Sequence, residues 1–297
     1  MKRQIVIDTD PGLDDAIAII FAVASGRFDV VGITTVAGNI GLEQTTRNAG
    51  SLLAMLGRSD IPVVSGASQA MLRNNMDELL VHGGGDLRDL NFREPVVSPR
   101  TGATAWLAET LRAAPSGAID VLALGPLTNI GKLVNEHPDA AARIGNLICM
   151  GGSIHEPGNA GPKAEFNFAS DPEAVALVLR ASIRTTIVAL DLTRTMRADR
   201  AYLEALRGTV PGDMAADLLA AWWREGELSR PLHDPSVMLL ALAPELFEIE
   251  MRRVSVDLSD GPDAGALVEH ENVGQPVSIA MRVDAPAALA LLASGLR

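Results

Sequence analysis

Four carboxylates lie within eight residues near the start of the chain, at Asp8, Asp10, Asp14 and Asp15. They follow an apolar run and precede an apolar helical pattern. Such a dense cluster repels itself unless a cation or a proton neutralises it. Oxygen ligands of this kind suit calcium or magnesium better than zinc. Ligands of open α/β sheets bind just beyond the carboxyl ends of the strands, so we predict a metal-dependent active site with residues 8–15 as its floor.

The alternative for this cluster is that Asp14 and Asp15 only cap a helix that begins near Leu13, because acids favour that end of a helix. For one acid the capping interpretation would be the better one. Four acids together favour the metal site.

A second acidic motif, His233-Asp234-Pro235, precedes the helical run from Ser236 to Ala243. Taken alone, an Asp before Pro is most often a helix cap. Its combination with the amino-terminal acids favours a functional role.

Two further segments could complete a site. The segment 124–129 follows a buried strand and is either a tight turn into a helix or the source of a free backbone carbonyl that serves as a neutral metal ligand. The segments 158–159 and 164–167 carry polar side chains that suit sugar hydroxyls, although such a segment is often only a loop. Residues 66–103 are poor in regular pattern and contain His82, which is typical of a functional loop.

Composition restricts the class of protein. Of 297 residues, 47% are hydrophobic and 21% are charged, as in ordinary globular proteins. The net charge of −12 argues against a nucleic-acid or anionic-membrane partner. No apolar run reaches the roughly 18 residues of a membrane span, and the first residues lack a signal core, so a cytoplasmic protein is expected. Cys149 is the only cysteine, which excludes an intrachain disulfide and a cysteine-rich zinc site.

Apolar strands and helical patterns alternate along the chain. Strands are expected over 4–9, 29–36, 61–65, 119–124, 146–150, 184–190, 251–257 and 277–283. Helices are expected over 13–24, 42–57, 104–113, 128–136 and 171–180, through most of 198–243, and after Asp284. This alternation predicts one α/β domain over 1–297, with a doubly wound, mostly parallel, Rossmann-like sheet, helices on both faces and the active site at the strand carboxyl ends.

Together these motifs resemble the nucleoside hydrolases, the family that includes the inosine-uridine preferring enzymes. The resemblance covers nearly the whole chain and rests on motifs in a fixed order. They are the segments 8–16, 34–39, 125–129, 150–152, 164–167, 171–174 and 233–235. The first of these, with its four acids, is the most specific.

The resemblance implies that the protein binds a calcium ion and hydrolyses the N-glycosidic bond of a ribonucleoside. The implied calcium ligands are Asp10, Asp15, Asp234 and the backbone carbonyl of Leu124. Many relatives carry Thr at the carbonyl position, and a backbone ligand tolerates that change. The implied ribose contacts are Asp14, Asn39, Asn159, Glu165 and Asn167, with Met150 lining the sugar.

The chemistry expected of these groups is attack by water through an oxocarbenium-like transition state. Asp10 is the expected general base. His233 is the candidate acid for the leaving base, because a histidine titrates near pH ~6.5. His82 is a plausible second contact to the base, or only an exposed loop histidine.

The base pocket departs from the family pattern. Relatives often place tyrosines before the His-Asp-Pro motif, whereas here Trp222 and Trp223 stand in a shortened segment and Tyr202 is the only tyrosine. Trp222 or Trp223 either stacks on the base or packs within a helix. Base preference is therefore open. We also expect a homo-oligomer, a dimer or a tetramer.

Two other functions compete with this one. A metal-dependent phosphatase of the haloacid dehalogenase type also places an Asp-x-Asp pair after its first strand, but we find no convincing lysine and late acidic pair. A ribose- or nucleoside-binding module would need affinity without a water-activating carboxylate, and the presence of both Asp10 and His233 argues against it.

Overall fold

The computed structural model describes residues 2–73, 93–223, 226–272 and 274–297. One ten-stranded sheet forms its centre, in the order β11-β10-β12-β7-β6-β5-β1-β2-β3-β4. The strands of this sheet are β1 (Arg3–Thr9), β2 (Phe28–Thr35), β3 (Val63–Ser65), β4 (Arg100–Thr101), β5 (Ile119–Ala123), β6 (Leu147–Met150), β7 (Thr185–Val188), β10 (Phe247–Val256), β11 (Leu267–Glu269) and β12 (Pro276–Val283). All neighbours from β12 to β4 pair in parallel, and only β10 pairs antiparallel, with β11 and with β12.

The chain reverses its direction of travel across the sheet between β1 and β5. From β1 it proceeds outward through β2, β3 and β4, and it then returns to pair β5 with the other side of β1. A crevice forms at such a switch point, outside the carboxyl ends of the two central strands. Asp10 follows β1 and Leu124 follows β5, so both lie at this crevice.

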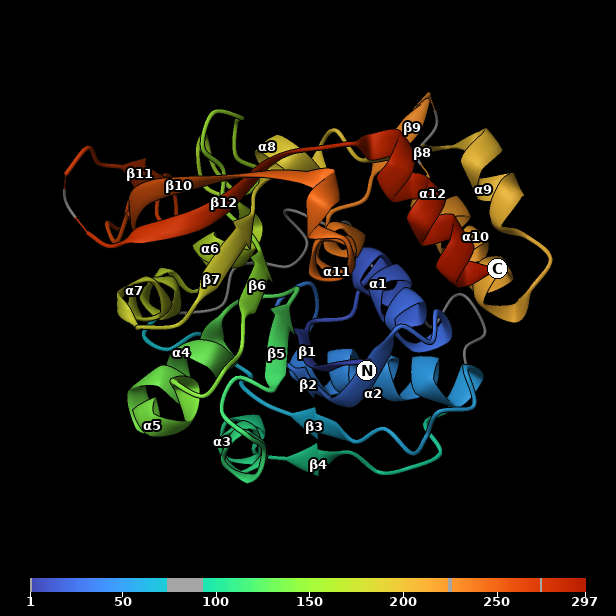
Figure 1. Cartoon of the computed structure of the whole chain (residues 1–297), viewed down its shortest axis with the longest axis horizontal. Coiled ribbons are helices and arrows are strands. Elements are labelled where there is room, and N and C mark those ends of the chain that lie inside the picture. Colours follow the sequence, from blue (N-terminus) through green and yellow to red (C-terminus); the bar gives the residue numbers. More distant parts are fainter. Residues whose placement is uncertain (1, 74–92, 224–225, 273) are drawn as a thin grey trace.

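Helices cover both faces of the sheet (Figure 1). The first face carries α1 (Leu13–Ala24), α2 (Leu42–Met55), α8 (Leu190–Thr193), α9 (Arg200–Leu206), α10 (Val210–Trp222), α11 (Asp234–Leu242) and α12 (Ala285–Leu296). The second carries α3 (Ala103–Ala113), α4 (Thr128–Glu136), α5 (Pro138–Ala141), α6 (Phe166–Ser170) and α7 (Pro172–Arg180). Alternate residues of the central strand β1 belong to the two cores: Ile5 and Ile7 face the first, and Val6 the second.

The expected α/β architecture is confirmed, with differences at the ends of elements and in short elements. The first helix and the helix over 128–136 have the expected bounds. The strand expected over 184–190 ends at Val188, and Leu190 begins α8. The mostly helical segment 198–243 also contributes to a separate two-stranded sheet, formed by β8 (Arg197–Asp199) and β9 (Ser229–Pro231). A 3₁₀ turn, η3 (Pro244–Leu246), leads directly into β10, which begins four residues before the expected strand.

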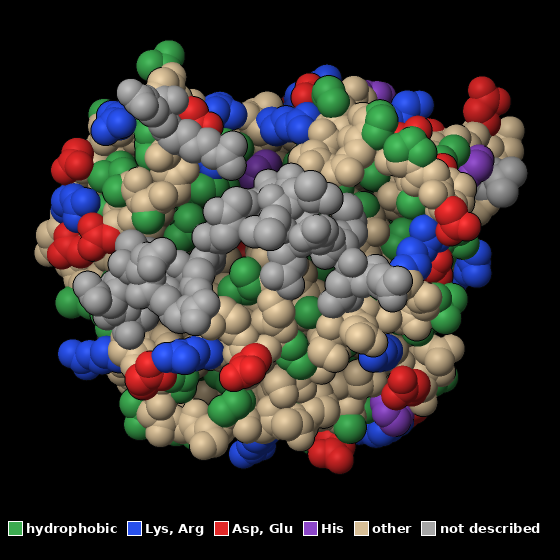
Figure 2. All heavy atoms as spheres, turned by 180° about the vertical axis from the view of Figure 1, so that it is seen from behind, with side chains coloured by type: hydrophobic (Ala, Val, Ile, Leu, Met, Phe, Trp, Pro, Cys, Tyr) green, Lys and Arg blue, Asp and Glu red, His purple; other side chains and the backbone are tan. Residues whose placement is uncertain are grey.

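The surface carries both signs of charge side by side. Figure 2 shows Lys and Arg side chains next to Asp and Glu side chains around the periphery of one face. Ion pairs between exposed side chains of the described residues include that of Arg112 with Asp139 at 2.7 Å. In the described part of the chain, no helix has both the length and the apolar character needed to cross a bilayer.

Candidate active site

A pocket of about 580 Å³ opens at the switch point between β1 and β5. Segments far apart in the sequence line it: Gly12, Leu13, Asp14, Asp15, Asn39, Leu124, Met150, Asn159, Glu165, Phe166, Asn167, Trp222, His233 and Asp234. Ten of these are residues that the sequence predicted for the site. Asp10 is hydrogen-bonded to the backbone N–H of Asn39, and His82 is outside the described residues.

Asp10 is buried beneath this pocket with one oxygen bound and one oxygen unbound. Its Oδ2 accepts the backbone N–H of Asn39 at 2.6 Å. Its Oδ1 is buried and has no hydrogen-bond partner within the described residues. Burial, reinforced by the nearby charge of Asp15, raises the pKa of Asp10 well above its ordinary value. The carboxylate therefore has a free acceptor and an environment that calls for a positive charge or a proton.

Two glycines press against the carboxylate of Asp10. A Cβ on Gly38 would lie 2.1 Å from Oδ2, and a Cβ on Gly125 would lie 2.2 Å from Oδ1. Both are closer than any real contact, so only glycine leaves room for Asp10 in this orientation. Sequence analysis included both glycines in motifs but assigned them no role, since no local pattern reveals such an approach.

Asp14 joins the amino-terminal motif to the distant His-Asp-Pro motif. Its Oδ2 accepts the backbone N–H groups of His233 at 2.7 Å and Asp234 at 3.1 Å. Its Oδ1 is buried without a hydrogen-bond partner in the described structure. Burial raises the pKa of Asp14 to about 8, although the N–H donors oppose this rise. Burial and the charges of Asp15, Asp14 and Asp10 likewise raise the pKa of Asp234.

Asp15 is held rigidly by three donors. The hydroxyl of Thr9 donates to its Oδ1 at 2.6 Å, and the backbone N–H of Gly12 and the amide of Asn39 each donate to Oδ2 at 3.1 Å. In the Gly12 contact the carboxylate at the third helical position accepts the N–H of the N-cap residue, which caps the start of α1. Capping and site formation therefore occur together, and the two interpretations of these acids do not exclude each other.

The side of the pocket opposite these acids is built around Asn167 and Glu165. The amide of Asn167 donates to the carbonyl of Leu124 at 2.6 Å and to the carbonyl of Met150 at 3.3 Å. Glu165 caps α6 and accepts N–H groups from Asn167 and Phe168. Burial raises the pKa of Glu165 to about 7.

Asn159 is the exposed member of this wall, on a loop held from both sides. Its side-chain oxygen accepts the N–H of Phe166 at 2.8 Å. Arg194 donates to the carbonyls of Pro157 at 2.8 Å and Gly158 at 3.3 Å. The loop therefore presents Asn159 in a defined position at the pocket.

His233 and Trp222 form a further part of the pocket lining. His233 is half-buried, and its Nδ1 lies 2.7 Å from the hydroxyl of Thr193, a residue that sequence analysis did not single out. Trp222 lines the pocket, whereas the neighbouring Trp223 donates from Nε1 to the carbonyl of Glu227 at 2.9 Å and is not part of the lining. Of the two tryptophans, the structure thus places Trp222 at the site.

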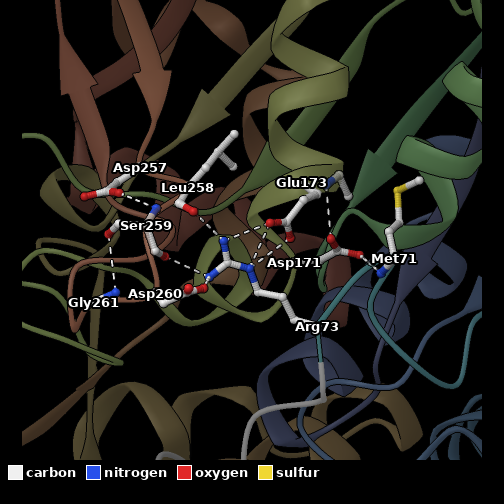
Figure 3. A network of polar contacts seen from close by, with 10 residues as sticks. Met71, Arg73, Asp171, Glu173, Asp257, Leu258, Ser259, Asp260 and Gly261 are labelled. Carbon is white, nitrogen blue, oxygen red and sulfur yellow. Dashed lines mark hydrogen bonds and ion pairs between the residues drawn. The ribbon is translucent and has the colours of Figure 1, made fainter.

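Residues 71–73 are fastened to α7 and to the loop after β10 (Figure 3). Arg73 bridges Glu173 of α7 and the carbonyls of Leu258 at 2.8 Å and Ser259 at 2.9 Å. Asp171 accepts the N–H of Met71 at 2.9 Å. These contacts tie residues 71–73 to α7 and to the loop after β10.

The donor set fits a cation, although its geometry is not that of a finished site. Among the described residues, no three His, Cys, Asp or Glu side chains are arranged as a ready-made metal site. Buried, unbonded oxygens nevertheless remain on Asp10 and Asp14, and the carbonyl of Leu124 retains a lone pair beside its bond to Asn167. Carboxylate and carbonyl oxygens are the ligands of hard cations.

Comparisons with known proteins show the family. Residues 5–290 match the model of the family described as inosine-uridine preferring nucleoside hydrolase. The pyrimidine-specific ribonucleoside hydrolase RihA of Salmonella agona is 37% identical over 266 residues, which cover 86% of this chain and 85% of that protein. The non-specific ribonucleoside hydrolase RihC of Salmonella paratyphi B is 36% identical over 293 residues, covering 95% and 94%.

Solved structures give the same result. The plant nucleoside hydrolase PpNRh1 superposes with a TM-score of 0.91 at 31% identity, covering 100% of this chain and 99% of that chain. This chain, with its acidic switch-point pocket, belongs to the inosine-uridine preferring nucleoside hydrolase family.

Proposed function

We propose that this N-glycosidase hydrolyses inosine- or uridine-type ribonucleosides to ribose and free base with a calcium ion held by Asp10, Asp15, Asp234 and the Leu124 carbonyl. The observation that carries the proposal is the buried acid cluster at the switch point, in which Asp10 and Asp14 each keep an oxygen without a partner in the described structure. Buried carboxylates with no counter-charge are costly. A bound calcium ion would supply the missing positive charge and coordination sites for ribose hydroxyls and a water.

Asp10 acts as the general base in this proposal. Asn39 and the two glycines fix its carboxylate, and Oδ1, which has no hydrogen-bond partner among the described residues, is the oxygen that would accept a proton from water. The water oxygen forms a bond to the anomeric carbon while the N-glycosidic bond breaks. Its proton goes to Asp10, and the bonding electron pair leaves with the base. Direct attack of this kind inverts the anomeric carbon, and base assistance typically contributes about 10²–10⁴-fold.

The remaining polar groups bind and stabilise the sugar. Asp14, Asn39, Asn159, Glu165 and Asn167 surround the pocket and are proposed to bind ribose hydroxyls, with Met150 against the ring. Carboxylates beside the ring would also stabilise the positive charge of an oxocarbenium-like transition state. Glu165 Oε1 accepts the backbone N–H of Asn167 at 3.0 Å, which favours one fixed sugar orientation.

His233 is the proposed acid for the departing base. Its Nδ1 is engaged with Thr193, so the ring has a defined orientation, and Nε2 is the atom that would donate a proton to the base. His82 remains a proposed second contact to the base.

We propose inosine- and uridine-type substrates alike, without a preference between purine and pyrimidine bases. The pyrimidine-specific and non-specific enzymes are similarly related to this chain, at 37% and 36% identity, so relatedness does not decide between them. Trp222 at the pocket supports an aromatic contact with either kind of base.

The proposed function is tested with a panel of purine and pyrimidine ribonucleosides, scored by release of free base before and after exhaustive chelation. We expect turnover that chelation abolishes and added calcium restores. Full activity in protein confirmed to be metal-free would remove the ion from the mechanism. Binding without turnover would instead indicate a nucleoside-binding module, and release of phosphate from nucleoside monophosphates without release of base would indicate a phosphatase.

We also propose the domain organisation, the cellular location and the oligomeric state of the protein. We infer one domain over 1–297, since one ten-stranded sheet and the two cores on its faces involve segments from β1 to α12. We infer a cytoplasmic location, which the single, buried and unpaired Cys149 supports. We infer a dimer or a tetramer, which sedimentation of the purified protein would test.

A further inference from the structure

Two arginine–tryptophan pairs flank the carboxyl end of α10. The guanidinium carbon of Arg230 lies 4.4 Å from the ring centroid of Trp222, and that of Arg200 lies 5.2 Å from the ring centroid of Trp223. Both distances are within the range of cation–π attraction. Of these two pairs, only the first involves a residue of the pocket lining, so the second serves as a matched pair outside that lining.

Arg230 is an unusually buried cation. It lies on β9 with 8% of its surface exposed, paired with Glu227 at 2.7 Å. Its Nε is buried and has no hydrogen-bond partner in the described structure. Burying a guanidinium is costly when it is incompletely bonded. The Trp222 ring is therefore one of the main groups that compensate the charge.

We propose that Arg230 is a positioning residue that acts on the leaving base through Trp222. It holds the Trp222 ring in the pocket wall and offsets the negative charge of the ring face. This inference rests on the proposed hydrolysis of ribonucleosides. Arg230 is absent from the pocket lining and acts through Trp222.

The chemistry of the leaving group explains why such a pair would help. When the N-glycosidic bond breaks, its electron pair stays on the base, so the base gains negative charge. The face of an aromatic ring is itself negative and repels an anion. A guanidinium stacked on the ring counteracts this repulsion. Trp222 backed by Arg230 should therefore favour the departing base over the neutral base of the bound substrate, which raises turnover.

Arg230 has a second route to the site, which the experiment must separate from the first. Its positive charge acts on Asp14, lowering the pKa of that carboxyl against the effect of burial. Through Asp14 the arginine would affect ribose binding. Through Trp222 it would affect the base and leave ribose binding unchanged.

The experiment is a double-mutant cycle of Arg230→Met and Trp222→Leu, with Arg200→Met as the matched control and Arg230→Lys as the variant that keeps the charge. Turnover of uridine, inosine and p-nitrophenyl riboside is measured for each variant, together with competitive inhibition by ribose, which lacks a base. Nitrophenolate is a stable anion, so its release should depend little on stabilisation by the Trp222 ring and Arg230.

We expect Arg230→Met to lower kcat/KM for uridine and inosine by about two- to thirtyfold, the range of a cation–π contact. The loss on p-nitrophenyl riboside should be smaller, and inhibition by ribose should stay within about twofold of the wild type. Arg230→Lys should retain most of the activity, and Arg200→Met should match the wild type. The double variant should lose no more than Trp222→Leu alone, because Arg230 acts through that ring.

Additive losses in the double variant, or weaker inhibition by ribose in Arg230→Met, would show that Arg230 acts through Asp14 and would overturn the proposal. Equal losses on all three ribosides would overturn it too. If Arg230→Met does not fold, Arg230→Lys decides, since it must keep the wild-type order of the three substrates. A wild-type protein that releases no base from any riboside would instead contradict the proposed function itself.

Discussion

The carboxylate of Asp14 accepts the backbone N–H of His233 at 2.7 Å, across 219 residues of sequence. The same oxygen accepts the N–H of Asp234. The start of α1 and the start of α11 are thereby fixed against each other, and the two acidic motifs form one site. A residue expected to bind ribose is thus also part of the framework that holds the proposed metal ligands.

Replacing Asp14 should separate these two contributions. Asp14→Asn keeps one acceptor oxygen for the two N–H groups, whereas Asp14→Ala leaves them buried without it. An unsatisfied buried donor costs about 1–3 kcal/mol, so in urea unfolding we expect Asp14→Ala to be less stable than Asp14→Asn by that amount. Both should lose activity. Equal stabilities would mean that the contact with His233 does not hold the two helices.

Gly125→Ala should disable Asp10 without unfolding the protein. The new Cβ would lie 2.2 Å from Asp10 Oδ1, and the carboxylate must rotate away because the rest of its surroundings is fixed. We expect turnover to fall by at least the roughly 10²-fold typical of losing a general base. The control is Gly41→Ala, where a Cβ meets nothing within 4 Å. Normal turnover in Gly125→Ala would show that the orientation of Asp10 is not critical.

The stability of the metal-free protein should fall as pH rises. Burial raises the pKa of Asp14 from 3.8 to about 8 and that of Glu165 from 4.5 to about 7. Between the ordinary pKa and the raised pKa of each carboxyl, the native state holds a proton that the unfolded chain releases. The free energy of unfolding therefore decreases with rising pH. We expect chelated protein to have a higher Tm at pH ~6 than at pH ~8, and calcium to raise Tm more at the higher pH.

Glu165→Gln provides the control for this measurement. It cannot titrate, so its Tm should depend less on pH than that of the wild type. A Tm of the metal-free wild type that is constant or increases between these pH values would contradict the raised pKa values of the buried acids.

Part of this site follows from the sequence because its predicted residues lie at strand ends. Asp10 and Leu124 come directly after apolar runs that are predicted to be strands, and ligands of open α/β sheets bind at such ends. The resemblance to the nucleoside hydrolases implies that these residues and Asn39 belong to one site. The structure adds that β1 pairs with both β5 and β2, so the three residues follow neighbouring strands.

Other features of the structure depend on packing between distant segments, which no local sequence pattern predicts. Trp222 and Trp223 are adjacent, and only the end of α10 and the turn to β9 decide which ring reaches the pocket. The pairing of β8 with β9 involves only three residues on each side, too few for a detectable period. The closeness of Gly38 and Gly125 to Asp10 depends on three loops meeting at one point.

Ribose should be required over deoxyribose. A substrate without the 2′-hydroxyl would leave buried polar groups among the proposed ribose contacts unpaired. Sites built to bind a hydroxyl reject substrates that lack it by up to about 10⁴–10⁵-fold. The measurement compares kcat/KM for uridine and deoxyuridine. An Asn159→Ala variant serves as a reference, since this exposed contact should contribute less than the buried ones. Similar rates on the two nucleosides would contradict the proposed ribose contacts.

His233→Ala should harm natural nucleosides far more than p-nitrophenyl riboside. Hypoxanthine and uracil need a proton or equivalent stabilisation to leave, whereas nitrophenolate leaves without one and still requires Asp10 and the ribose contacts. Thr193→Val is the companion variant, because it removes the hydroxyl 2.7 Å from Nδ1 while keeping the imidazole, and it should cause a smaller loss with the same selectivity. Turnover of inosine, uridine and p-nitrophenyl riboside is measured for both variants. An equal loss on all three substrates would mean that His233 acts by positioning Asp234, the next residue and the start of α11, and its role as an acid would then be withdrawn.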